Sequence, residues 1–144
     1  MVLATWCGSG LAPVAPGTFG TLAAIPLYLL VARLELPFYL AFLALFTMLA
    51  CWVAGRAEAL FGKHDAGEIV IDEVAGYLLT MLAVTPTWTH VVAGFFLFRL
   101  FDIVKPPPAR QFDRYMKNGT GVVLDDLAAG AYACLSLHLL ARWL

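Results

Sequence analysis

Two carboxylates, Asp72 and Glu73, interrupt an apolar segment that begins at Ile69 and continues to Val84. On insertion-based scales a charged residue at the centre of a membrane helix costs roughly 2.5 to 3.5 kcal/mol, so such residues usually face a partner, an aqueous cavity or an ion. The chain is 62% hydrophobic and only 13% charged, whereas soluble domains contain about 25% charged residues. These features predict an integral membrane protein whose buried acids have a function.

Similar apolar segments recur along the chain, whose 144 residues correspond to a single domain, 1–144. They predict an all-α membrane bundle of four to five hydrophobic helices, some of them short or kinked. The first and third segments are shorter than the roughly 20 residues of a full membrane span. The expected helices cover residues 18–32, 37–55, 69–84, 88–104 and 124–144.

Charge distribution predicts the orientation and the class of partner. With five spans, most basic residues fall on one side of the membrane: Arg56, Lys63, Lys105, Arg110, Arg114 and Lys117. Because loops rich in Lys and Arg stay in the cytoplasm, we expect a multi-pass protein with a cytoplasmic N-terminus. The net charge of −1 and the lack of a dense basic stripe argue against nucleic-acid binding, which leaves membrane lipids as expected partners.

The segment from His64 to Glu73 holds the densest group of acids. If a helix begins near Asp65, then Asp65, Glu68 and Asp72 line one face and Glu73 points to an adjacent one. Clustered carboxylates repel one another unless a cation neutralises them, and oxygen-only ligands suit Mg²⁺. His64 is a candidate proton donor or acceptor. The alternative is a solvated loop followed by an acid paired with a basic residue on another helix.

Two further motifs contain candidate phosphate-binding residues. Thr18 follows a Gly- and Pro-rich stretch, and as an N-cap it would leave first-turn N–H groups free to bind a phosphate; the alternative is a simple tight turn. Arg99 shares a helix face with Asp102, and its planar fork suits either a phosphate or a carboxylate. The alternative for Arg99 is a purely structural ion pair. Lys105 and Arg110 would bind phosphate at the interface or extend to lipid headgroups.

The last segment begins with a second pair of acids, Asp125 and Asp126. Acids near the start of a helix often interact only with the helix dipole. One of the two is expected to do so, whereas the other would complete a metal site with Asp72 and Asp102, since all of these residues lie near the same membrane face.

Taken together and in this order, the motifs make the sequence resemble the phosphatidylglycerophosphatase A family. The resemblance rests on GSGLAPVAPGTFGT at 8–21, HDAGEIVIDEVAG at 64–76, FRLFDIVKPPPARQFDR at 98–114 and GTGVVLDDLAAGAYA at 119–133. It implies a Mg²⁺-requiring enzyme of the bacterial cytoplasmic membrane that acts in phospholipid biosynthesis. Its substrate would be phosphatidylglycerol phosphate, which it hydrolyses to phosphatidylglycerol and phosphate. The sequence differs from many relatives at Pro107, where a Trp is expected.

The predicted active site therefore lies at the cytoplasmic face. Its candidate catalytic residues are His64, Asp65, Asp72 and Glu73; its phosphate-binding residues are Thr18, Arg99, Lys105 and Arg110; and its metal ligands are drawn from Glu68, Asp72, Asp102, Asp125 and Asp126. Direct attack by water and an aspartyl-phosphate on Asp72 both remain open as mechanisms.

A small ion or proton carrier is the alternative function, with Asp72, Glu73 and Arg99 as its relay. A carrier needs polar residues leading to both faces, but the non-cytoplasmic half is nearly bare of them, which favours the one-sided enzyme. Glycines inside the apolar segments are candidates for close helix packing, within one chain or between copies in an oligomer: Gly55, Gly76, Gly94 and Gly130.

Overall fold

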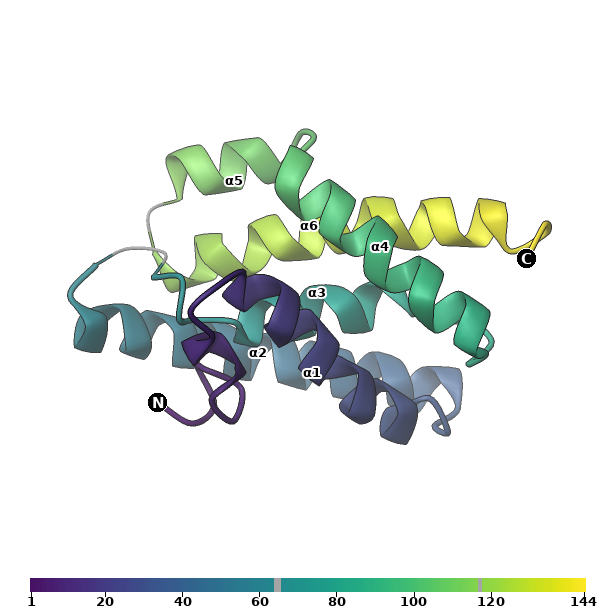
Figure 1. Cartoon of the computed structure of the whole chain (residues 1–144), viewed down its shortest axis with the longest axis horizontal. Coiled ribbons are helices and arrows are strands. Elements are labelled where there is room, and N and C mark those ends of the chain that lie inside the picture. Colours follow the sequence, from purple (N-terminus) through teal and green to yellow (C-terminus); the bar gives the residue numbers. More distant parts are fainter. Residues whose placement is uncertain (64–65, 117) are drawn as a thin grey trace.

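The computed structural model describes residues 1–63, 66–116 and 118–144, and within these ranges the fold is all-α, as predicted (Figure 1). Five of its six α-helices correspond to the five apolar segments of the sequence. In chain order the elements are the 3₁₀-helix η1 (Ser9–Leu11), α1 (Pro16–Val31), α2 (Leu36–Phe61), α3 (Ile71–Thr80), α4 (Trp88–Val104), α5 (Ala109–Tyr115) and α6 (Gly119–Leu140).

The short helix α3 lies at the centre of the bundle. It packs most extensively against α6 and also against α1 and α2 (Figure 1), and nearly all of its residues are buried. Backbone polar groups at its two ends have partners, which non-helical backbone inside a membrane protein requires. Ala4 accepts hydrogen bonds from the N–H groups of Val70 and Ile71 at 2.8 and 3.2 Å, and Tyr39 donates to the Leu78 carbonyl at 2.5 Å. The N-terminal segment and α2 thus hold a helix that is too short to span a membrane.

Several predicted boundaries were wrong. The third helix was expected over 69–84 but covers only Ile71–Thr80, and the last begins at Gly119 rather than near Leu124. There the side chain of Asn118 accepts a hydrogen bond from the Gly121 N–H at 2.9 Å, which caps the helix five residues earlier than hydrophobicity alone indicated. The second helix continues past Gly55 to Phe61, and α5 was not predicted. The apolar pattern thus underestimated the lengths of α2 and α6 and overestimated that of α3.

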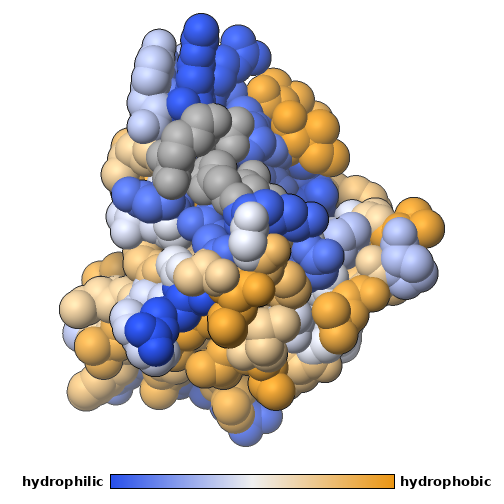
Figure 2. Space-filling model, turned by 90° about the vertical axis from the view of Figure 1, so that its left-hand side faces the viewer, coloured by the Kyte–Doolittle hydropathy of each residue, from blue (hydrophilic) through white to orange (hydrophobic). Residues whose placement is uncertain are grey.

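Two helices among the described residues, α2 and α6, are long and apolar enough to cross a membrane, and α1 is a shorter apolar helix. Large apolar side chains also form outward-facing stripes at helical spacing: Leu45, Met48 and Trp52 on α2, and Phe96, Leu100 and Ile103 on α4. Figure 2 views the end of the bundle where α5 lies; hydrophilic residues predominate in its upper part, beside one hydrophobic patch, and hydrophobic residues predominate below. Exposed apolar area of this extent is typical of a lipid-facing surface.

Candidate active site

Carboxylates from α3 and α6 meet in the interior of the bundle. Asp72 and Glu73 lie in the first turn of α3, and Asp126 projects from α6 toward them; one carboxylate oxygen from each lies within 4.8 Å of the others. Asp72 and Asp126 are only 4% and 3% exposed. The structure therefore brings together two of the predicted metal ligands with Glu73, which sequence reasoning had placed on a different helix face.

Each of the three carboxylates has one buried oxygen without a hydrogen-bond partner among the described residues. Asp72 Oδ1, Glu73 Oε2 and Asp126 Oδ2 are all buried, and none has a partner among the described residues. A buried, unpaired carboxylate costs several kcal/mol, and like charges close together add to that cost. A bound cation would remove both penalties, and an all-oxygen donor set fits Mg²⁺ or another hard divalent ion.

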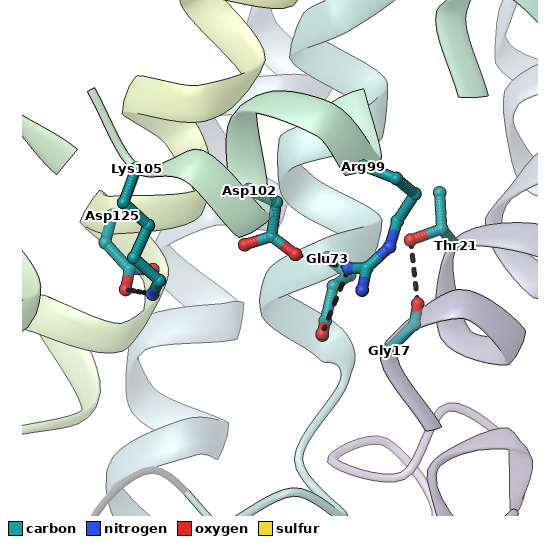
Figure 3. Close-up of polar contacts among 7 residues, drawn as sticks. All are labelled: Gly17, Thr21, Glu73, Arg99, Asp102, Lys105 and Asp125. Carbon is teal, nitrogen blue, oxygen red and sulfur yellow. Dashed lines mark hydrogen bonds and ion pairs between the residues drawn. The ribbon is translucent and has the colours of Figure 1, made fainter. Parts of the chain in front are cut away.

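Arg99, on α4, lies beside Glu73, one of the three acids of this cluster (Figure 3). Its Nη1 pairs with Asp102 Oδ2 and lies 4.0 Å from Glu73 Oε1. The Nε of Arg99 is buried without a hydrogen-bond partner in the described part of the chain. Asp102 is close enough to interact electrostatically with Asp72, Glu73 and Asp126. Asp102 thus orients Arg99, which retains a donor that a phosphate oxygen would accept from.

The neighbouring acid Asp125 has a different partner from Asp126. Lys105, the residue after α4, donates from Nζ to Asp125 Oδ2 at 2.7 Å (Figure 3). Asp125 is 4% exposed, so the acid of this ion pair is shielded from water, whereas the Lys105 side chain is 28% exposed. Of the two adjacent acids of α6, Asp126 is therefore one of the three converging carboxylates, whereas Asp125 pairs with Lys105 and adds a neighbouring charge to them.

The start of α1 packs directly on the pair formed by Glu73 and Arg99. A Cβ added to Gly17 would lie 2.6 Å from Glu73 Oε1 and 3.1 Å from Arg99 Nη1, so a larger residue there would displace these two side chains. Sequence reasoning missed Gly17, although its place after Pro16 marks the helix start. It was also wrong about Thr18, which is the third residue of α1 rather than the N-cap, since the helix begins at Pro16.

The remaining predicted residues lie outside the carboxylate cluster or outside the described residues. Glu68 precedes α3 instead of sharing a helix face with Asp72, and its Oε2 lies 3.8 Å from Lys63 Nζ with the side chain 37% exposed. It borders a surface cavity of about 410 Å³, which is lined by Gly10, Leu11, Ala12, Pro13, Pro16, Lys63, Gly67 and Glu68. Arg110 is exposed on α5. His64 and Asp65 lie outside the described residues.

A family model and two relatives of known name point to the same protein family. The family model described as PgpA, Phosphatidylglycerophosphatase A, matches residues 2–141. Proteins named Phosphatidylglycerophosphatase A from Haemophilus influenzae and Escherichia coli K12 are each 39% identical, over 99% and 98% of this chain and 89% and 83% of their own lengths.

A third relative carries a different name. A Bacteroides thetaiotaomicron protein named "Putative phosphatidylinositol-3-phosphatase" is 40% identical over 99% of this chain and 93% of its own length. No protein of known structure matches the chain. The family match extends over nearly the whole sequence and includes every helix that contributes to the carboxylate cluster. The chain therefore belongs to the phosphatidylglycerophosphatase A family.

Proposed function

We propose that this protein is a Mg²⁺-dependent lipid phosphatase that hydrolyses phosphatidylglycerol phosphate to phosphatidylglycerol and phosphate. The observation that carries the proposal is the set of buried, unpartnered oxygens on Asp72, Glu73 and Asp126. Family membership and the names of the Haemophilus influenzae and Escherichia coli relatives support the choice of substrate.

The residues in and around the cluster have different roles in binding a phosphomonoester. Asp72, Glu73 and Asp126 would hold Mg²⁺, which when bound polarises the phosphoryl group and neutralises its charge. Arg99, held by Asp102, donates to phosphoryl oxygens and stabilises the charge that develops on them. Lys105, held by Asp125, supplies a second cation at the edge of the site.

In the direct reaction, a water oxygen forms the new bond to phosphorus while the bond from phosphorus to the glycerol oxygen breaks. A proton leaves the water and a proton reaches the departing glycerol oxygen, so the products are phosphate and an alcohol. His64 and Asp65 are the proposed proton carriers. In the covalent alternative Asp72 attacks phosphorus first, and trapping a phosphorylated Asp72 by rapid quench would distinguish the two routes.

We also propose a multi-pass arrangement in the cytoplasmic membrane, with the N-terminus and the carboxylate cluster toward the cytoplasm. The basic residues Arg56, Arg110 and Arg114 lie at the same end of the sequence-derived topology. A headgroup phosphate presented at the cytoplasmic leaflet would then reach the acids from the polar end of the bundle. The carrier alternative has less support, because the opposite half provides no comparable group of acids in the described ranges.

A second substrate has one specific observation in its favour. The name of the Bacteroides thetaiotaomicron relative indicates a phosphoinositide monoester, and the same carboxylates and arginine would serve that reaction. The test is phosphate release by the purified protein from phosphatidylglycerol phosphate, phosphatidylinositol-3-phosphate and phosphatidic acid, each with Mg²⁺ and with chelator. We expect Mg²⁺-dependent release that is fastest for phosphatidylglycerol phosphate; no release from any of the three would contradict the proposed function.

A further inference from the structure

Two glycines lie about one helical turn beyond the acids that face each other across α3 and α6. Gly76 follows Asp72 by four residues, and Gly130 follows Asp126 by four residues. Residues four apart share a helix face, so each glycine lies on the same side of its helix as the acid. The contact between the two helices at these glycines is therefore in a position to govern the distance between the two acids.

The two backbones touch at this point. A Cβ added to Gly130 would overlap the carbonyl oxygen of Gly76 and would lie 3.2 Å from its carbonyl carbon. A Cβ added to Gly76 would lie 2.8 Å from the carbonyl oxygen of Asp126 and 2.5 Å from Cε2 of Phe98. Contacts this close are not tolerated, and backbone atoms cannot turn aside as a flexible side chain does. Any side chain at either position must push α3 and α6 apart.

We propose that Gly76 and Gly130 are positioning residues that set the size of the divalent-cation site and thereby favour Mg²⁺ over larger ions. The inference rests on the proposed function, since it requires that Asp72, Glu73 and Asp126 hold a cation. Mg²⁺ demands near-octahedral oxygen ligands at about 2.0 to 2.1 Å, whereas Ca²⁺ accepts about 2.3 to 2.6 Å in flexible geometry. A site widened at the glycine contact therefore loses Mg²⁺ before it loses Ca²⁺.

The experiment is calorimetric titration of Mg²⁺ and of Ca²⁺ into the purified full-length protein in detergent, without lipid substrate. Gly130→Ala is compared with the wild type and with Gly94→Ala. Gly94 is the control for adding a methyl group at another helix contact, because a Cβ there would lie 2.5 Å from Met81 Sδ, a side-chain atom, with no acid among its nearest neighbours. We expect Gly130→Ala to weaken Mg²⁺ binding by about tenfold or more and Ca²⁺ binding by less, while Gly94→Ala leaves the ratio of the two affinities unchanged.

An unchanged ratio in folded Gly130→Ala would overturn the inference, and so would an equal shift in Gly94→Ala. Failure of the proposed function has a different signature, because the wild-type protein would then bind no Mg²⁺ at all. If Gly130→Ala does not fold, the double variant Gly76→Ala with Phe98→Ala replaces it. That variant removes the ring but keeps the new Cβ against the Asp126 carbonyl, so the same shift toward Ca²⁺ is expected and its absence counts against the inference.

Discussion

Buried polar groups at one end of α3 have hydrogen-bond partners, whereas some at the other end have none. At the C-terminal end, buried tyrosine hydroxyls donate to backbone carbonyls: Tyr39 to Leu78 at 2.5 Å, Tyr77 to Val91 at 3.0 Å and Tyr28 to Val84 at 3.5 Å. At the N-terminal end, Asp72, Glu73 and Asp126 each have one buried oxygen with no hydrogen-bond partner in the described residues.

Burial alone therefore does not distinguish structural from functional polar residues in this bundle. A buried polar group with a partner contributes to folding, whereas one without a partner is costly and needs a ligand to offset that cost. The comparison predicts that changes at the acid end will alter activity far more than stability, and that changes at the tyrosine end will do the reverse.

The largest effect is expected from Asp126→Asn. Loss of a carboxylate from the cluster removes several kcal/mol of charge stabilisation through the metal, which corresponds to about a thousandfold slower phosphate release. In chelator, by contrast, the variant should melt at a higher temperature than the wild type, because one of the mutually repelling buried charges is gone. Phosphate release with Mg²⁺ and thermal melting in chelator test both parts.

Glu35→Gln is the control for Asp126→Asn, since Glu35 is exposed in the turn before α2 and its neutralisation should change neither quantity appreciably. If Asp126→Asn kept full activity, the acids at the N-terminal end of α3 would not form the catalytic site.

Arg99→Lys should have the next largest effect. Lysine keeps the charge but not the planar fork, so it cannot pair with Asp102 and also donate to a phosphate in the same geometry. The loss of a charge-assisted hydrogen bond corresponds to roughly a 10- to 100-fold decrease in kcat/KM. Steady-state kinetics over a range of substrate concentrations test this, with Arg56→Lys on α2 as the matched control. Equal kcat/KM values for Arg99→Lys and the wild type would leave Arg99 with only a structural role.

Asp125→Asn tests whether two adjacent acids of α6, Asp125 and Asp126, have different roles. Because Asp125 pairs with Lys105 and is not one of the three converging carboxylates, its neutralisation should remove the charged partner of the lysine and raise KM by about tenfold. The Mg²⁺ concentration that gives half-maximal activity should be the same in Asp125→Asn as in the wild type. In Asp126→Asn, any residual activity should need a different Mg²⁺ concentration. A large shift in that concentration for Asp125→Asn would mean that both acids take part in metal binding.

Much of the fold was predictable because apolar segments and helix breakers are local signals. The five hydrophobic helices and the position of α4 followed from segment composition and from Pro86. The length of α3 did not follow, because its N-terminal end depends on hydrogen bonds to Ala4, far away in the sequence. The start of α6 was predictable in principle from Asn118, a good N-cap residue that lies outside the apolar segment.

The site was predictable as a collection of residue types but not as a geometry. Asp72, Glu73, Arg99 and Asp126 all stood out as charges in apolar surroundings. Which of the α6 acids joins the cluster depends on the rotation of α6 against α3, and the two helices are in close contact at Gly76 and Gly130. A helix face assigned from one sequence segment cannot supply this information, because it depends on two segments about 50 residues apart.

The smallest effect, and the one that tests the tyrosine end, is expected from Tyr39→Phe. The change removes the hydroxyl that donates to the Leu78 carbonyl and leaves that buried acceptor without this donor, at a cost of about 1 to 3 kcal/mol of unfolding free energy. Phosphate release measured well below the melting temperature should equal that of the wild type, since the acids lie at the other end of α3.

Tyr115→Phe is the control, because Tyr115 is 71% exposed on α5 and its substitution should change stability by no more than about 0.5 kcal/mol. If folded Tyr39→Phe lost activity as Asp126→Asn does, the two ends of α3 would act as one unit, and the division between a structural end and a catalytic end would be wrong.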